Sequence, residues 1–178
     1  LAFAEDIGDG DHTTLCCIPE TAMGKSQLII KEDGVLAGVE MAKRIFHDFD
    51  PELKMTVFIQ DGAEVKKGDI AFVVEGKIQS LLQTERLMLN VMQRMSGIAT
   101  TTRKYAKALE GTKTHVLDTR KTTPGMRMIE KEAVRIGGGM NHRIGLFDMI
   151  LLKDNHVDFA GGIEHSVISI RTMLRSSS

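Results

Sequence analysis

The stretch TERLMLNVMQRMSGIATTTRKY, residues 84–105, carries a long helical pattern and divides the chain into two parts. From residue 78 to residue 95 the pattern places Leu81, Leu82, Glu85, Met88, Leu89, Met92 and Met95 on one stripe. The pattern continues after Gly97 into residues 100–109. We therefore predict a long helix at the junction of two domains, residues 1–96 and residues 97–178.

The part before this helix has the pattern of a small α/β sandwich. Strands are predicted over residues 25–31, 53–59 and 70–75, and the apolar spacing of residues 38–49 predicts a helix. Asp-Gly and Lys-Gly-Asp turn signals lie between the second and third predicted strands.

The part after the long helix alternates short strands with helices. Strands are predicted at Thr114–Leu117 and Met149–Leu152. One helix is predicted to start at Thr123-Pro124 and to stop at Gly137–Gly139, and another covers Gly162–Arg175. Strands that alternate with helices imply parallel strands with right-handed crossovers.

The composition excludes several classes of protein. The chain has 178 residues, 42% of them hydrophobic, and a net charge of −1, so it is expected to fold as a globule without a nucleic-acid-binding surface. No apolar run approaches the ~20 residues that a membrane span needs. The neighbouring cysteines, Cys16 and Cys17, match no zinc-ligand spacing, which favours a reducing, cytoplasmic compartment.

Positive charge is concentrated in one segment. Residues 113–153 hold eight Lys or Arg against four Asp or Glu. Arg120 and Lys121 follow the predicted strand that ends at Leu117, and Lys153 follows the strand that ends at Leu152. Loops at the carboxyl ends of parallel strands face a common opening. We expect these cations, joined by the segment Asn141-His142-Arg143, to bind a ligand with more than one negative charge.

Four motifs resemble those of the quinolinate phosphoribosyltransferases, which are also called carboxylating nicotinate-nucleotide pyrophosphorylases. They are EDIGDGDHTT (5–14), the stretch 84–105 quoted above, LDTRKTTPGMRMIEKEAVRIGGGMNHRIG (117–145) and DMILLKDNHV (148–157). The resemblance covers residues 4–165. The order of the DTRKTTPG, GGGMNHR and KDNH blocks makes it highly specific.

The resemblance implies a fold and a reaction. The fold class is α/β: an N-terminal open sandwich followed by an incomplete α/β barrel. The reaction transfers the phosphoribosyl group of phosphoribosyl pyrophosphate to quinolinate, with Mg²⁺, and releases pyrophosphate and carbon dioxide. The product, nicotinate mononucleotide, feeds NAD synthesis.

The resemblance also assigns roles to single residues. Arg120, His142, Arg143 and Lys153 would line the quinolinate pocket, while Lys121 and Lys153 would face phosphoribosyl pyrophosphate as the catalytic pair. Arg86 would reach into the site of a neighbouring subunit, which makes a homodimer the smallest active unit. No residue of this chain is expected to bind a metal directly. Asp154 and His156 have no third ligand nearby in the sequence, so we interpret them as orienting Lys153 and its loop.

The segment after the long helix is short for a barrel. A full α/β barrel takes roughly 250 residues, so fewer than 90 residues build about half of one. We expect exposed apolar faces and unpaired strand edges. We also expect the chain to be part of a longer protein, and inactive by itself.

Other functions remain open at this point. A molybdenum-associated pyrophosphorylase-like protein and a nicotinate phosphoribosyltransferase are near alternatives that differ in substrate. The segment DGAEVKKGD, residues 61–69, resembles the hairpin of biotinyl and lipoyl carriers, although the attachment turn of a carrier is missing. A non-catalytic binding fragment is the last alternative.

Overall fold

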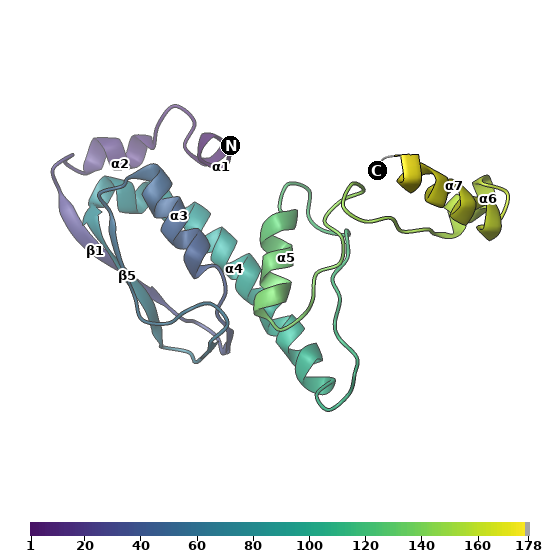
Figure 1. The fold of residues 1–178 in the computed structure, drawn as a ribbon. Helices are drawn as coiled ribbons and strands as arrows, with labels where there is room; N and C mark the ends of the chain where they lie inside the picture. Colours follow the sequence, from purple (N-terminus) through teal and green to yellow (C-terminus); the bar gives the residue numbers. More distant parts are fainter. Residues whose placement is uncertain (177–178) are drawn as a thin grey trace. The chain divides into compact units, whose positions relative to one another are not determined.

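The computed structural model describes residues 1–176, which form two compact units (Figure 1). The first unit is Leu1–His142 and the second is Arg143–Ser178. The first unit contains an antiparallel sheet, the long helix and the loop that carries Arg120 and Lys121. The second unit contains two helices and the segment that leads to them.

An antiparallel sheet of order β1-β5-β3 forms one layer of the first unit. Its strands are β1 (Met23–Ile29), β3 (Lys54–Val57) and β5 (Ile70–Lys77), and β5 is the central and most buried of them. The register pairs Lys25 with Glu75, and their side chains form an exposed salt bridge. A second pair, β2 (Gly34–Val35) with β4 (Glu64–Val65), is also antiparallel.

Helices cover this sheet, as the α/β sandwich predicted. The helix α3 (Val39–Phe49) begins after Gly38, where the Asp61 carboxylate accepts hydrogen bonds from the Val39 and Glu40 N–H groups. Two short helices precede the sheet, α1 (Ala2–Asp6) and α2 (His12–Cys17). The prediction of a small sandwich before the long helix is confirmed in the first unit.

The predicted junction helix is one continuous element, α4 (Ile78–Ala108), which passes through Gly97 without a break. Its buried stripe contributes Leu81, Met88, Met92 and Met95 to the same core as Val39, Phe46 and Phe72. Further along, α4 packs against α5 (Arg127–Ile136), whose Ala133 is fully buried. One helix therefore connects the sandwich core with α5.

Two hydroxyl groups of α4 are bonded to the backbone of the segment 35–37. Ser96 Oγ accepts a hydrogen bond from the Ala37 N–H at 3.0 Å, and Thr100 Oγ1 accepts one from the Val35 N–H at 2.9 Å. Ala37 and Val35 are 0% and 3% exposed, so these hydroxyl groups satisfy N–H groups of buried residues.

The glycine run 137–139 ends α5 and lets it approach α4 closely. A Cβ atom at Gly137 would lie 2.6 Å from the Ala99 carbonyl oxygen and 2.7 Å from Thr102 Cβ. The Gly138 N–H donates to the Arg135 carbonyl, with Gly138 at a φ of 95°. The prediction that this run stops the helix is confirmed.

Other predictions about local structure need correction. The helix predicted to start at Thr123-Pro124 begins at Arg127, because residues 124–125 form a turn with Gly125 at a φ of 77°. The strand predicted at Thr114–Leu117 is reduced to one parallel bridge between Leu117 and Met140. The strand predicted at Met149–Leu152 does not form, since no strand among residues 1–176 pairs with it and its Met149 and Ile150 are half exposed.

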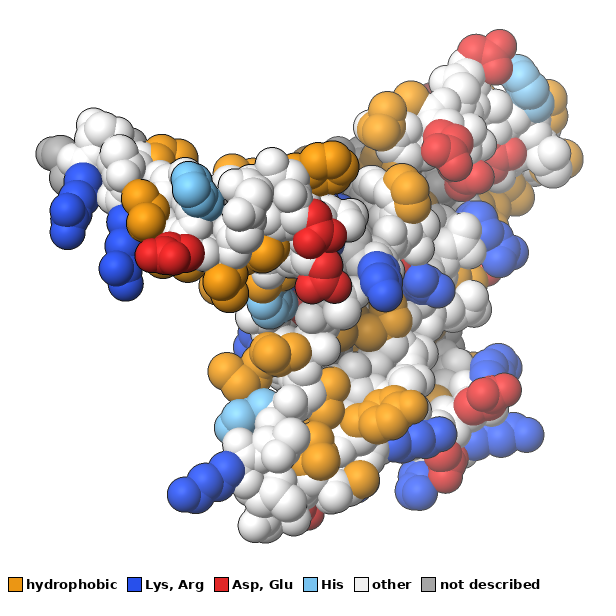
Figure 2. Space-filling model, turned by 90° about the vertical axis from the view of Figure 1, so that its right-hand side faces the viewer, with side chains coloured by type: hydrophobic (Ala, Val, Ile, Leu, Met, Phe, Trp, Pro, Cys, Tyr) orange, Lys and Arg blue, Asp and Glu red, His pale blue; other side chains and the backbone are white. Residues whose placement is uncertain are grey.

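The second unit exposes much of its apolar surface. Its helices are α6 (Asp154–Phe159) and α7 (Ile163–Ser176), and the latter confirms the helix predicted at Gly162–Arg175. Phe147 is 85% exposed and Phe159 93%. Hydrophobic side chains are visible on the face drawn in Figure 2. No helix within the described residues is both long and apolar enough to cross a membrane.

The two α4 hydroxyls give the first testable prediction. Thr100→Val keeps the side-chain shape but removes the acceptor for the Val35 N–H, so it should cost about 1–3 kcal/mol of unfolding free energy. Ser96→Ala should cost a similar amount. Urea denaturation measures both. The matched control is Thr101→Val, which alters an exposed hydroxyl bonded only within the helix and should change stability little. Equal stability of all three variants would contradict the assigned role.

Candidate anion-binding site

The loop 118–123, hereafter the cation loop, connects the Leu117 bridge to the turn before α5 and carries Arg120 and Lys121. Around the bridge, the Met140 N–H donates to the Val116 carbonyl at 2.8 Å and the Asp118 N–H donates to the Met140 carbonyl at 3.1 Å. Because the bridge is parallel, the segments that follow Leu117 and Met140 leave it in the same direction. The cation loop and His142 therefore start side by side.

A buried carboxylate at Asp118 joins these two segments. Asp118 Oδ1 accepts a hydrogen bond from the His142 N–H at 2.8 Å and forms an ion pair with Lys131 Nζ. The two side chains are 6% and 3% exposed. Lys131 Nζ also donates to the His142 carbonyl at 2.9 Å. With its NH2 group oriented toward them, Asn141 donates to Asp118 Oδ2 and to the Lys131 carbonyl, each at 2.9 Å.

A second carboxylate, Glu130, holds the far end of the cation loop. Its Oε2 accepts a hydrogen bond from the Thr123 N–H at 3.1 Å, and its Oε1 forms a salt bridge with Arg94 of α4 at 2.7 Å. Arg94 also donates to Thr123 Oγ1 at 3.1 Å. Burial by itself raises the pKa of Glu130, but the hydrogen bonds from Thr123 and Arg94 outweigh it, so the pKa is lowered overall.

The cation loop leaves one guanidinium nitrogen without an acceptor. Arg120 Nε is buried and has no hydrogen-bond partner in the described part of the chain. Lys121 is exposed, and its backbone N–H donates to Thr119 Oγ1 at 3.0 Å. A buried donor without an acceptor is costly and favours an anionic partner. Arg120 Nε is therefore a candidate donor to an anionic ligand.

Of the predicted site residues, the structure brings Arg120, Lys121 and His142 together in the first unit. It places Arg86 apart from them, exposed on α4 eight residues before Arg94, which corresponds to about 12 Å along the helix axis. The position of Arg86 is compatible with a role toward another subunit.

Arg143 and Lys153 belong to the second unit. Arg143 donates from NH1 to the Met149 carbonyl at 3.0 Å. In the same loop Asp148 accepts hydrogen bonds from the Ile144 and Gly145 N–H groups, both at 2.8 Å, and these bonds lower the pKa of Asp148. The Lys153 N–H donates to His156 Nδ1 at 3.0 Å, so His156 fixes the backbone of Lys153 at the start of α6.

Sequence reasoning missed the side chains that hold the cation loop: Arg94, Asp118, Glu130, Lys131 and Asn141. A signal for two of them was present. Glu130 and Lys131 directly follow Ile129 and lie within one turn of Ala133, on the side of a short amphipathic helix that must be buried. Charged residues at such positions are buried only when they are paired.

The described residues do not form a site for Mg²⁺ by themselves. No group of three or more His, Cys, Asp or Glu side chains in residues 1–176 could hold a metal ion. The two carboxylates nearest the cation loop, Asp118 and Glu130, are engaged with Lys131 and Arg94.

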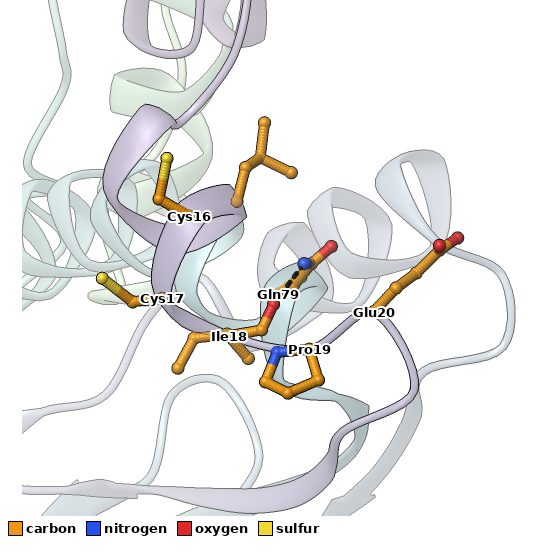
Figure 3. Close-up of a pocket in the computed structure, with 7 residues that line it drawn as sticks. Cys16, Cys17, Ile18, Pro19, Glu20 and Gln79 are labelled. Atoms are coloured by element: carbon orange, nitrogen blue, oxygen red, sulfur yellow. Dashed lines mark hydrogen bonds between the residues drawn. The ribbon is translucent and has the colours of Figure 1, made fainter.

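A depression of about 530 Å³ lies elsewhere in the first unit, at the end of α2 (Figure 3). Cys16 and Cys17 are exposed thiols at its edge, and Gln79 Nε2 donates to the Ile18 carbonyl at 2.7 Å. None of its described lining residues is Lys, Arg or His. This depression lacks the charge that a dicarboxylate or a phosphate needs.

Comparisons with known proteins agree with the sequence motifs. The model of the quinolinate phosphoribosyl transferase N-terminal domain matches residues 11–96, and that of the C-terminal domain matches residues 98–178. The chain is 47% identical over 178 residues to "Quinolinate phosphoribosyltransferase [decarboxylating] 1" of Nicotiana glauca, covering 99% of this chain and 50% of the relative. It is 49% identical over 168 residues to the chloroplastic carboxylating nicotinate-nucleotide pyrophosphorylase of Oryza sativa subsp. japonica. That match covers 94% of this chain and 45% of the relative.

A solved structure has the same fold. NadC from Streptococcus pyogenes superposes with a TM-score of 0.92 at 40% identity, covering 97% of this chain and 61% of that one. The fold is therefore an α/β sandwich joined to part of an α/β barrel, as predicted. The chain belongs to the quinolinate phosphoribosyltransferase family. It spans about half the length of the curated relatives it matches.

The lowered pKa of Glu130 predicts a pH dependence of stability. A carboxylate whose pKa is lower in the folded state contributes stability that is present above the ordinary Glu value of 4.5 and is lost as the pH falls through the lowered value. Glu130→Gln should therefore be less stable than the wild type at neutral pH, and the difference should shrink as the pH falls below the ordinary Glu value. Urea denaturation at several pH values measures this. A difference that stays constant with pH would contradict it.

Proposed function

We propose that the protein containing this chain transfers the phosphoribosyl group of phosphoribosyl pyrophosphate to quinolinate with decarboxylation. The products are nicotinate mononucleotide, pyrophosphate and carbon dioxide, and the reaction serves de novo NAD synthesis. One observation supports this most directly: among the described residues, Arg120 Nε is buried without an acceptor. Its loop is held at one end by the Asp118–Lys131 ion pair and at the other by the hydrogen bond from the Thr123 N–H to Glu130.

The charge pattern suits the proposed substrate. Quinolinate has two adjacent carboxylates, so it needs at least two cationic partners, and each charge-assisted hydrogen bond contributes roughly 1.5–3 kcal/mol. In this proposal Arg120, His142, Arg143 and Lys153 bind quinolinate. Lys121 and Lys153 face phosphoribosyl pyrophosphate and stabilise the departing pyrophosphate electrostatically.

The reaction needs no covalent intermediate with the protein. The pyridine nitrogen attacks C1 of the ribose through an oxocarbenium-like state, while the C1–O bond breaks and its electron pair leaves with pyrophosphate. The pyridinium that forms accepts the electrons of the C–CO₂ bond as carbon dioxide departs, and a proton then replaces the lost carboxylate. The protein supplies orientation and positive charge to both ends of this exchange.

The remaining parts of the proposal concern partners and setting. Mg²⁺ accompanies phosphoribosyl pyrophosphate as a complex with its phosphate oxygens. The active unit is a homodimer, with Arg86 supplied in trans. The location is cytoplasmic, which suits the two exposed thiols of Cys16 and Cys17.

Loss of Arg120 should impair the use of quinolinate more than it destabilises the fold. The experiment uses the protein extended to the length of its relatives, with quinolinate, phosphoribosyl pyrophosphate and Mg²⁺, and it measures mononucleotide formation. Arg120→Ala should lower kcat/KM for quinolinate by at least ~10-fold with little change in Tm, since it removes a charge-assisted contact of about 1.5–3 kcal/mol.

Two controls make this result specific. Arg44→Ala removes an exposed cation of α3 that pairs only with Asp48 among the described residues, and it should change nothing. Nicotinate, which has a single carboxylate, should be a poor substrate for the wild type. Preferential use of nicotinate would favour a nicotinate phosphoribosyltransferase, and an unchanged kcat/KM in Arg120→Ala would refute the proposed site.

If Arg86 is supplied by the neighbouring subunit, variants at Arg86 and at Arg120 should complement each other in a mixed dimer. Arg86→Ala and Arg120→Ala should each have activity at least ~10-fold below the wild type when alone. If each site takes Arg86 from one subunit and Arg120 from the other, a mixed dimer contains one intact site. Random reassembly should then restore about a quarter of wild-type activity. Absence of any recovery after verified subunit exchange would show that Arg86 acts within its own subunit or not at all.

A further inference from the structure

Two adjacent side chains of α5 hold opposite ends of the cation loop. Lys131 bonds to Asp118, where the loop begins, and Glu130 bonds to Thr123, where it ends. Neighbouring residues of a helix point about 100° apart, so the same turn reaches both ends of the loop. Each side chain also bonds outside the loop, Lys131 to the His142 carbonyl and Glu130 to Arg94 of α4.

Stability alone does not account for a buried ion pair. Replacing such a pair by apolar residues of similar size is often neutral or stabilising, whereas removing one partner is strongly destabilising. The side chains of Lys131 and Asp118 are 3% and 6% exposed, so their desolvation is nearly complete. Unlike apolar packing, the ion pair orients its neighbours. Its hydrogen bonds fix the Asp118 carboxylate together with the N–H and carbonyl groups of His142.

Few other hydrogen bonds to the loop are seen within residues 1–176. Within it the Lys121 N–H donates to Thr119 Oγ1, and Thr122 Oγ1 accepts from Arg127 Nε at 3.1 Å. The start of the loop follows a single β-bridge rather than a full strand. The positions of Arg120 and Lys121 therefore depend on the contacts at Asp118 and Thr123.

We propose that Glu130 and Lys131 are positioning residues, a clamp that sets the cation loop and His142 in register for the dicarboxylate substrate. This inference rests on the proposed function for the identity of the ligand. The clamp acts through the residues that it holds and touches no substrate itself.

The test compares three variants of the protein extended to the length of its relatives. Asp118→Leu/Lys131→Met replaces the ion pair by apolar groups, and Asp118→Asn/Lys131→Gln keeps hydrogen-bonding groups without charge. Glu130→Ala releases the other end, and it leaves no isolated buried charge because the Arg94 side chain is 50% exposed. The control is Glu132→Gln/Arg135→Gln, which removes an exposed ion pair from the same helix.

Two measurements are made on variants whose Tm shows that they are folded. The first is amide hydrogen exchange at residues 118–123 and 140–142, and the second is kcat/KM for quinolinate. The apolar pair and Glu130→Ala should speed exchange in these segments and lower kcat/KM by ~10- to ~100-fold, as expected when binding groups are misplaced by about 1 Å. Asp118→Asn/Lys131→Gln should restore part of the exchange protection and part of kcat/KM. The control Glu132→Gln/Arg135→Gln should match the wild type in both.

The outcomes separate the two proposals. Unchanged exchange and unchanged kcat/KM in a folded apolar pair or in Glu130→Ala would overturn the clamp. If the apolar pair does not fold, Glu130→Ala decides, through exchange at Thr123 and kcat/KM. If the wild type turns over no quinolinate while exchange still responds to the variants, the clamp stands and the proposed function fails.

Discussion

The packing of α4 is the constraint on which the rest of the structure depends. This single helix of 31 residues supplies Met88, Met92 and Met95 to the sandwich core and then presents Ala99 and Thr102 to α5. Each fully buried apolar side chain contributes roughly 1.5–3 kcal/mol, so the helix cannot shift without loss on both sides. The absence of a side chain at Gly137 sets how near α5 can come, and Glu130 then meets Arg94 across the same contact.

The electrostatics of the cation loop follow from this packing. Because α5 is held against α4, its two buried charges lie at fixed positions beneath the loop, and each is paired with a partner of opposite sign. The two carboxylates near the loop are thereby engaged in ion pairs with Arg94 and Lys131. Arg120 is left with a buried nitrogen that has no acceptor within the described residues. The carboxylates of Asp118 and Glu130 are paired with Lys131 and Arg94, so they do not neutralise Arg120.

Sequence reasoning recovered the elements with strong periodicity and missed those that depend on distant partners. The stripe of α4 and the amphipathic α3 and α7 were predictable, because the apolar spacing of a helix is local. The strand predicted at Met149–Leu152 is absent, because a short apolar run becomes a strand only beside another strand. The start of α5 was misplaced because Pro124 suits a turn as well as the first turn of a helix. Among the site residues, Arg120, Lys121 and His142 were named from the sequence, but the bridge between Leu117 and Met140 that brings their segments together was not predicted. Their support by Glu130 and Lys131 depends on tertiary contacts.

The buried pair of Asp118 and Lys131 explains how a site can be ordered where the sheet is minimal. In a complete parallel sheet, ladder hydrogen bonds along several residues would fix where a strand ends. Here Leu117 and Met140 share one bridge, and the directional bonds beyond it come from side chains. An apolar contact at this place would bring the segments together without setting their rotation, because hydrophobic attraction has no preferred direction. An ion pair with additional hydrogen bonds to both segments fixes distance and rotation together. That requirement gives a physical reason to retain two buried charges whose net contribution to folding free energy is small.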